Sequence, residues 1–177
     1  MTDIFKKRRA VRNYSEKPIK HEQIKEILSA AMYAPSGYDK HPLSFFLVQN
    51  NQMKYKLAKT NQWSSYADRT SILIVVCADP KQSDVWLEDA SIAAGYMWLK
   101  CAQMGIGACW IHIRDSKRLN GENGESYVKN LLKIPDHLRV VCFLAIGYPA
   151  VNFPEHNENE YSEKKIHYNN WGGKEKI

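Results

Sequence analysis

The sequence lacks the motifs that identify several classes of enzyme. It contains no G-x-G-x-x-G after a predicted strand and no G-x-x-x-x-G-K-[ST], which argues against a Rossmann dinucleotide fold and against a P-loop. The six histidines include no H-E-x-x-H and no i, i+4 pair, so no metal site is predicted. There is also no G-x-S-x-G elbow and no cysteine with an evident base.

Long apolar runs and paired cysteines are scarce as well. The uncharged stretch between Asp89 and Lys100 is far shorter than the roughly 18–20 residues that span a bilayer, and no apolar signal core follows the N-terminus. The four cysteines lie far apart, each in an apolar run, without a C-x-x-C pair. We therefore expect a soluble, cytoplasmic protein with buried free thiols; metal ligation and disulfides are the less favoured alternatives.

The composition is that of one globular domain with an excess of positive charge. A chain of 177 residues can bury most of its apolar surface, and 44% hydrophobic with 25% charged residues is ordinary for such a domain. The net charge of +6 and the pI near 9.1 favour anionic partners in general, namely phosphates, nucleotides, nucleic acid or acidic membranes.

The most informative stretch runs from residue 86 to residue 113. Its first part, to about Met104, is apolar in almost every direction of a 3.6-residue turn, a pattern typical of a helix surrounded by protein. After Gly105 and Gly107, residues 108–113 form an apolar run that predicts a buried strand. In so short a chain we expect a second subunit to cover part of the helix, which would lie at a homodimer interface; the alternative is the central helix of a monomer.

The rest of the chain mixes helices and strands. Strands are also predicted at 43–48, 71–78 and 139–146, and helices at 3–9, 21–33, 52–59, 115–119 and 126–132, the fourth of these capped by Asp115. No linker or repeat divides the sequence, so we predict a single α+β domain over residues 1–171 with at least four strands in a central sheet. From Val151 the chain has too few apolar residues for a core of its own, which predicts an extended arm and a disordered tail at 172–177.

A basic segment at residues 6–12, KKRRAVR, is the sharpest local feature. Its three arginines form an array of fork-shaped donors that suits phosphate. Three interpretations remain open: a solvated basic face, a nucleic-acid or nuclear-import patch, and a site for a small-molecule phosphate. The remaining sequence is mixed in sign and has no nucleic-acid motif, which weighs against the second.

Two further places offer polar groups to a ligand. The loop at 35–42 has two prolines and a glycine, and its Ser36, Asp39 and His41 can supply donors and acceptors; it can equally be a plain turn from helix to strand. His112 interrupts the strand that follows the long helix, and the alternative there is a partly buried histidine near a strand end.

Taken together, four segments resemble the nitroreductase family of FMN-dependent oxidoreductases. They are RRAVR at 8–12, similar to the family's R-R-S-x-R; APSGYDKHP at 34–42, similar to A-P-S-x-x-N-x-Q-P; GIGACWI at 105–111, similar to G-L-G-x-x-W-I; and IGYP at 146–149. No single segment is specific, but their order and spacing are, and the resemblance covers about residues 3–171.

The resemblance implies a mostly antiparallel sheet flanked by helices and a domain-swapped homodimer with FMN in two interfacial pockets. Arg8, Arg9 and Ala10 would meet the phosphate and ribityl chain, with Arg12 at the N1/O2 side of the flavin; Pro35, Ser36 and Asp39 would come from the other subunit; Ile111, His112 and Ile113 would pass the N5/O4 edge; and Lys164 or Lys165 of the C-terminal arm would close on the phosphate.

The implied activity passes electrons from NADH or NADPH through flavin N5 to a nitroaromatic, quinone or similar small acceptor in a ping-pong mechanism. The alternatives are an NAD(P)H:flavin or quinone reductase and, from another class, a phosphate- or nucleic-acid-binding module that uses residues 6–12. The sequence departs from the family pattern at Ala10, which replaces a serine, and at Asp39 and His41, which replace asparagine and glutamine. These departures put the strength of FMN binding in question.

Overall fold

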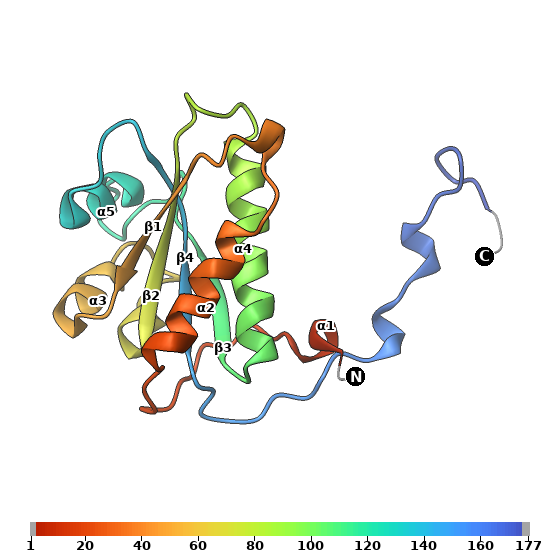
Figure 1. The fold of residues 1–177 in the computed structure, drawn as a ribbon, viewed down its shortest axis with the longest axis horizontal. Helices are drawn as coiled ribbons and strands as arrows, with labels where there is room; N and C mark the ends of the chain where they lie inside the picture. The colour runs from red at the N-terminus through yellow and green to blue at the C-terminus, as the bar shows by residue number, and fades with distance from the viewer. Residues whose placement is uncertain (1–2, 175–177) are drawn as a thin grey trace.

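The computed structural model describes residues 3–174, and a four-stranded antiparallel sheet forms its centre (Figure 1). The strands are β1 (Leu43–Val48), β2 (Ile72–Ala78), β3 (Gly107–His112) and β4 (Arg139–Gly147), in the spatial order β1-β2-β4-β3. All four predicted strands are therefore confirmed to within a residue at each end. β3 lies at one edge of the sheet, which leaves its outer backbone groups for other partners.

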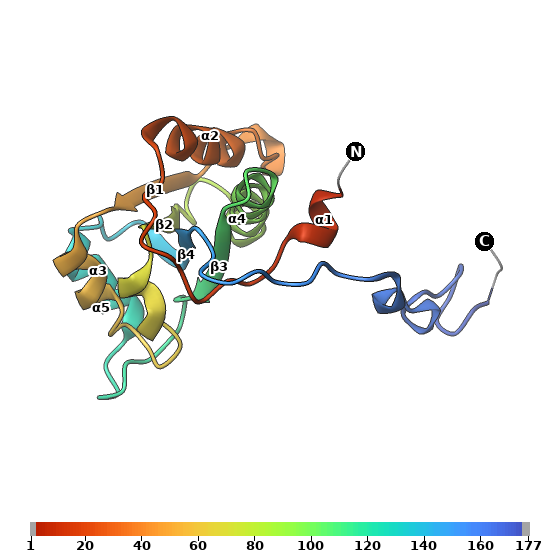
Figure 2. The ribbon, with the colours of Figure 1, turned by 90° about the horizontal axis from the view of Figure 1, so that it is seen from below.

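Helices cover both faces of the sheet (Figure 2). They are α1 (Ile4–Lys7), α2 (His21–Met32), α3 (Asn51–Leu57), α4 (Trp86–Gln103) and α5 (Gly124–Leu132). α2 and α4 pack on one face, and α3 and α5 lie on the other. The predicted α+β class with a sheet flanked by helices is confirmed.

One predicted helix, at 115–119, is wrong. Asp115 has a φ of +55°, outside the range of a helix cap, and residues 114–115 form a turn instead. Its carboxylate accepts hydrogen bonds from Arg114 and, at 3.1 Å, from Arg139 of β4. An aspartate that is engaged by two arginines is not available to satisfy the free backbone N–H groups of a helix.

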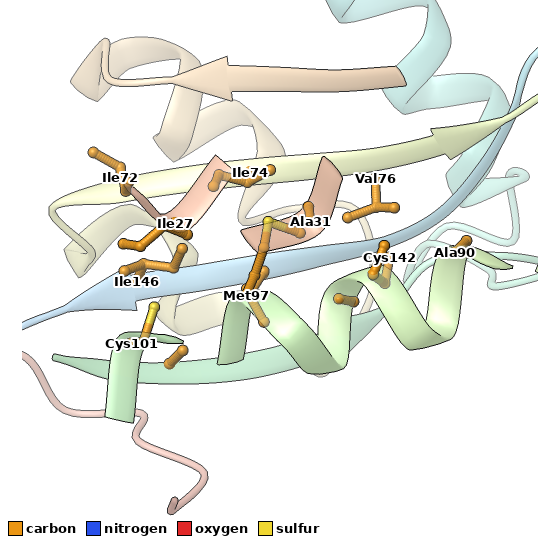
Figure 3. Packing of buried hydrophobic residues seen from close by; sticks show 14 of the residues in the cluster. Ile27, Ala31, Ile72, Ile74, Val76, Ala90, Met97, Cys101, Cys142 and Ile146 are labelled. Atoms are coloured by element: carbon orange, nitrogen blue, oxygen red, sulfur yellow. The ribbon is translucent and has the colours of Figure 1, made fainter. Parts of the chain in front are cut away.

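The core consists of two apolar layers, one on each side of β2. Ile72, Ile74 and Val76 point into the layer under α2 and α4 (Figure 3), while Leu73 and Val75 point into the layer under α3 and α5. Side chains on a strand alternate between faces, so a strand covered on both faces has to be apolar at every position. This is why the run at 71–78 could be recognised as a central strand.

The long helix α4 is only partly covered within one chain. Small residues at Ala90, Ala93 and Ala94 let it approach the sheet closely, and Met97 is fully buried beside them. On the opposite side, Ile92 and Tyr96 are each 41% exposed. The apolar circumference that the sequence predicts is therefore present, but the single chain leaves one stripe of it facing solvent.

The C-terminal arm, residues 151–174, extends away from the body of the molecule in both views (Figures 1 and 2). None of its residues is buried, and it contains only two short 3-10 turns, Glu158–Glu160 and Glu163–Lys165. The prediction of an extended arm is confirmed. Of the tail predicted to be disordered, residues 175–177 lie outside the described residues, and its disorder stays a prediction.

Candidate functional site

The basic segment lies against the edge strand β3. Ala10 forms a parallel bridge with Ala108, and the Val11 amide donates to the Ala108 carbonyl at 3.1 Å. This close approach requires a glycine at position 107, because a Cβ there would lie 2.8 Å from the Val11 side chain. The chain pairing thus fixes the arginines at the edge of the sheet.

Within residues 3–174, the arginines of this segment form no salt bridges. Among residues 3–174, no carboxylate lies within salt-bridge distance of the Arg8, Arg9 or Arg12 guanidinium group. Trp98 of α4 supports the segment instead: its indole N–H donates to the Arg9 carbonyl at 3.1 Å, and the Arg8 guanidinium lies 4.8 Å from the indole ring centre. Arg8 and Arg9 are half-buried and Arg12 is exposed, and guanidinium groups without a salt-bridge partner are suited to bind an anion.

A cavity of about 260 Å³ lies beside Arg9. Its walls come from the basic segment, from the end of α4 with the turn that follows it, and from the start of the arm; they include Lys7, Trp98, Gly105 and Phe153. Cationic and apolar groups therefore line the same space, together with the acidic residue Glu155.

Arg12 lies next to a buried phenol. The Tyr66 hydroxyl donates to Cys109 Sγ at 3.1 Å. Burial, and after it the hydrogen bond to Cys109, raises the pKa of Tyr66, while the nearby Arg12 guanidinium opposes the rise. The phenol therefore stays neutral, and the charge of Arg12 is not cancelled by a phenolate.

The loop between α2 and β1 has an unusual backbone. Tyr38, Asp39 and His41 have φ values of 51°, 58° and 44°, in the left-handed region that costs a non-glycine residue of the order of 1–3 kcal/mol. The His41 amide donates to Ser36 Oγ at 3.0 Å, and His41 Nε2 lies 2.6 Å from the Asp39 carboxylate. The polar groups that the sequence singles out in this loop thus contact one another.

The loop is held in this shape by a buried carboxylate of α4. Asp89 is 3% exposed, and its two oxygens accept hydrogen bonds from the Gly37 amide at 2.8 Å and from Ser83 Oγ at 2.9 Å. The sequence analysis missed both Asp89 and Ser83. An aspartate in the first turn of an otherwise apolar helix was the available signal.

The end of β3 places one polar side chain between two apolar ones. Ile111 and Ile113 are buried, and His112 is exposed, so the alternative of a partly buried histidine does not hold. The His112 carbonyl accepts a hydrogen bond from Asn61 Nδ2 at 2.8 Å. Asn61, also missed in the sequence, ties the loop after α3 to this strand.

Comparisons with known proteins agree with this arrangement. A model of the Nitroreductase family matches residues 5–65 and 63–148 of the chain. The chain belongs to the nitroreductase family. None of the helices in residues 3–174 combines the length and the apolar character that crossing a membrane would require.

Several members of the nitroreductase family are similar over most of the chain. The solved FMN-dependent nitroreductase from Clostridium difficile is 32% identical with a TM-score of 0.90, covering 94% of this chain and 98% of its own. A protein of Archaeoglobus fulgidus that carries the name NADH dehydrogenase/NAD(P)H nitroreductase is 32% identical over 93% of this chain and 94% of its own. The NADPH-flavin oxidoreductase of Vibrio harveyi is 24% identical over 89% of this chain and 73% of its own.

Within one chain, the predicted site residues of the basic segment lie apart from those of the loop. Arg8, Arg9, Ala10 and Arg12 lie beside β3, whereas Pro35, Ser36 and Asp39 lie near the first turn of α4 (Figure 1). The two groups are held by Trp98 and Asp89, nine positions apart on α4, which corresponds to about 14 Å along the helix axis. A single chain does not bring them into one pocket.

The prediction that Lys164 or Lys165 of the arm closes on the phosphate stays a prediction. Lys164 and Lys165 lie in the turn Glu163–Lys165, where the arm has left the body. The arm residue that contacts the arginines is His156, which lies 3.2 Å from Arg8 Nη2 and 3.3 Å from Arg9 Nη1. A histidine separated from its partners by 147 residues or more leaves no local pattern in the sequence.

Proposed function

We propose that this chain is an FMN-dependent NAD(P)H oxidoreductase that passes electrons from NADH or NADPH to a nitroaromatic, quinone or similar small acceptor by a ping-pong mechanism. The observation that carries the proposal is the trio of Arg8, Arg9 and Arg12, whose guanidinium groups have no carboxylate partners among residues 3–174. FMN dependence is named for the relative from Clostridium difficile, and NADPH and flavin are named for the relative from Vibrio harveyi.

The donors present fit a flavin phosphate. Paired guanidinium forks match phosphate oxygens, so Arg8 and Arg9 would hold the phosphate end, next to Ala10. Backbone groups of 111–113 and the loop residues Pro35, Ser36 and Asp39 of a second copy would hold the ring. When bound, FMN supplies a two-electron acceptor that NAD(P)H reduces and that a small oxidant reoxidises. The chain itself has to bind, orient and stabilise charge, and needs no nucleophile of its own.

We assign to Arg12 the stabilisation of the negative charge that the N1/O2 side of a reduced flavin carries. Arg12→Ala should then lower the flavin midpoint potential, by about 30 mV for each tenfold loss of preference for the reduced form. A redox titration of the reconstituted protein measures this. Lys81→Ala, the same change in net charge at an exposed turn, is the control and should leave the potential unchanged. An unchanged potential in Arg12→Ala would refute the assigned role.

The proposed enzyme is a homodimer in which each flavin site takes residues from both copies. Three observations support this: the distance between the two groups of site residues along α4, the exposed Ile92 and Tyr96 on the same helix, and the arm that leaves the body. Light scattering with size-exclusion chromatography should give the mass of two chains. The mass of one chain would overturn the proposal.

A second candidate function is an NAD(P)H:flavin reductase, which releases its flavin as product. It is favoured by Ala10, which offers no hydroxyl to the phosphate, and by Asp39, whose carboxylate is engaged by His41 at 2.6 Å and cannot donate. Steady-state rates with free FMN, quinones and nitroaromatics as acceptors separate the two functions.

The test of the flavoenzyme class is the colour of the purified protein. Yellow protein with flavin absorbance, or colourless protein that becomes yellow on reconstitution with FMN, supports it. Colourless protein that cannot be reconstituted, and that binds DNA with a strong dependence on salt, would instead support a nucleic-acid-binding module. A cytoplasmic location is part of the proposal and agrees with four buried, unpaired cysteines.

A further inference from the structure

The arm contacts the basic segment through His156 and Glu158. The His156 amide donates to the Lys6 carbonyl at 2.8 Å, and Glu158 forms a salt bridge with Lys6 at 3.2 Å. These contacts join an acidic stretch of the arm, residues 155–160, to the basic residues around α1. Charge complementarity therefore sets where the arm crosses the N-terminal segment.

The His156 ring lies between the two guanidinium groups. Nε2 is 3.2 Å from Arg8 Nη2 and 3.0 Å from the Arg8 carbonyl oxygen. Nδ1 is 3.3 Å from Arg9 Nη1 and 2.7 Å from the Glu160 carboxylate. Each ring nitrogen thus faces one guanidinium group and one acceptor, and which contact is a hydrogen bond depends on the tautomer.

Glu160 fixes the ring in this place. It is the nearest carboxylate to the imidazole, and the hydrogen bond from His156 lowers the pKa of Glu160. The carboxylate stays ionised and engages the imidazole, while no carboxylate of residues 3–174 lies within salt-bridge distance of the arginines. The ring therefore lies between the guanidinium groups and Glu160, whose pKa is lowered chiefly by His156 and to a smaller extent by Arg9.

We propose that His156 is a positioning residue that holds Arg8 and Arg9 for the flavin phosphate and so makes the protein select FMN over riboflavin. The proposal rests on the proposed function above, and it assigns to His156 the arm role expected of Lys164 or Lys165. Arginine side chains lose much rotamer freedom when they bind an anion. A ring that already confines both of them reduces that loss, and the acceptors at Arg8 O and Glu160 remain for the imidazole when phosphate takes the guanidinium N–H groups.

The test compares dissociation constants of FMN and riboflavin for the full-length protein freed of flavin, measured by quenching of flavin fluorescence. His156→Ala should weaken FMN binding about tenfold, the cost that one disordered long side chain can account for, and leave riboflavin binding unchanged. His156→Gln can still contact one guanidinium group, so its dissociation constant for FMN should lie between those of the unaltered protein and of His156→Ala. His167→Ala is the matched control, because His167 belongs to the same arm and stacks on Trp171 with ring centres 4.1 Å apart.

The ratio of the two constants separates positioning from a general role of the arm. An equal loss for both flavins, or no loss for either, in a variant with an unchanged melting temperature would overturn the assignment to His156. A tenfold loss of FMN binding in His167→Ala would overturn it too, since the arm as a whole would then be responsible. If the unaltered protein binds neither flavin, the proposed function itself fails.

Discussion

The body and the arm of this nitroreductase-family protein are stabilised by different kinds of interaction. In the body, two apolar layers enclose β2 and β4, and most of their side chains are fully buried. In the arm no residue is buried, and its contacts with the rest of the chain around α1 are polar. The body is thus held by the hydrophobic effect, and the arm by a few hydrogen bonds and ion pairs that are individually weak in water.

This difference indicates which parts of the proposed flavin site need a ligand or a second copy of the chain. The body fixes the backbone of the basic segment by itself, through the pairing of Ala10 and Val11 with β3. The arm is held in place only by its polar contacts with Lys6, Arg8 and Arg9. A phosphate and a second copy of the chain are the two partners that would give the arm a defined place.

The largest expected effect is a loss of unfolding free energy when a buried aromatic residue, rather than an exposed one, is replaced by alanine. Phe143 is fully buried in β4, whereas Trp171 is 88% exposed on the arm. Phe143→Ala should lower the free energy of unfolding by about 3–5 kcal/mol at every protein concentration, because it leaves a cavity in the core. Urea denaturation measures this loss.

Trp171→Ala sharpens the same comparison. If the arm contacts only its own chain, this substitution should lower the free energy of unfolding by no more than about 0.5 kcal/mol, the range of an exposed substitution. If the arm packs on a second copy, a further loss should appear and should grow with protein concentration, because dimer stability depends on it. A large loss that does not vary with concentration would mean that the arm belongs to the core of its own chain.

The parts of the fold that the sequence predicts well are those with local signals. The strand at 72–78 is apolar at every position, and α4 ends at a Gly-x-Gly, so both could be read from neighbouring residues. Asn50 caps α3 by accepting a hydrogen bond from the Met53 amide, only three residues away. The helix at 115–119 was wrong because its expected cap, Asp115, pairs with Arg139, which lies 24 residues further on.

The candidate site was harder to predict because its polar contacts are long-range. Asn61 reaches the His112 carbonyl across 51 residues, Gly37 reaches Asp89 across 52, and His156 reaches Arg8 across 148. None of these pairs produces a periodic pattern. The basic segment and the loop could be recognised from their own residue types, and the resemblance to a family supplied their roles toward FMN. Their partners were found only through the structure.

The next effect in size concerns the ionisation of a core thiol. Burial raises the pKa of Cys77 to about 12, above its ordinary value near 9. The unfolded chain therefore loses this proton first, so the stability that Cys77 contributes is complete below pH 9 and declines as the pH rises toward 12. Between pH 8 and 10.5 its share of the decline should be about 2 kcal/mol, at about 1.4 kcal/mol per pH unit above pH 9.

Cys77→Ala should make the dependence of the unfolding free energy on pH shallower by that amount, as measured by urea titrations at the two pH values. The arm provides the comparison. The pKa of Tyr168 is also raised, chiefly by desolvation, but this phenol is in contact with solvent. Tyr168→Phe should leave the pH dependence unchanged; if it were as effective as Cys77→Ala, the arm would be packed as firmly as the core.

The smallest expected effect compares two asparagine caps, one at an α-helix of the body and one at a 3-10 turn of the arm. Asn50 accepts a hydrogen bond from the Met53 amide at 2.9 Å at the start of α3, and Asn157 accepts one from the Asn159 amide at 2.9 Å in the arm. Asn50→Ala should cost about 1 kcal/mol, because α3 packs on the sheet and its cap contributes to the stability of the whole body. Asn157→Ala removes the same bond from a segment that can unfold by itself, so the free energy of global unfolding should not change. Equal losses in the two variants, measured by urea denaturation at one protein concentration, would show that the arm and the body unfold as one cooperative unit.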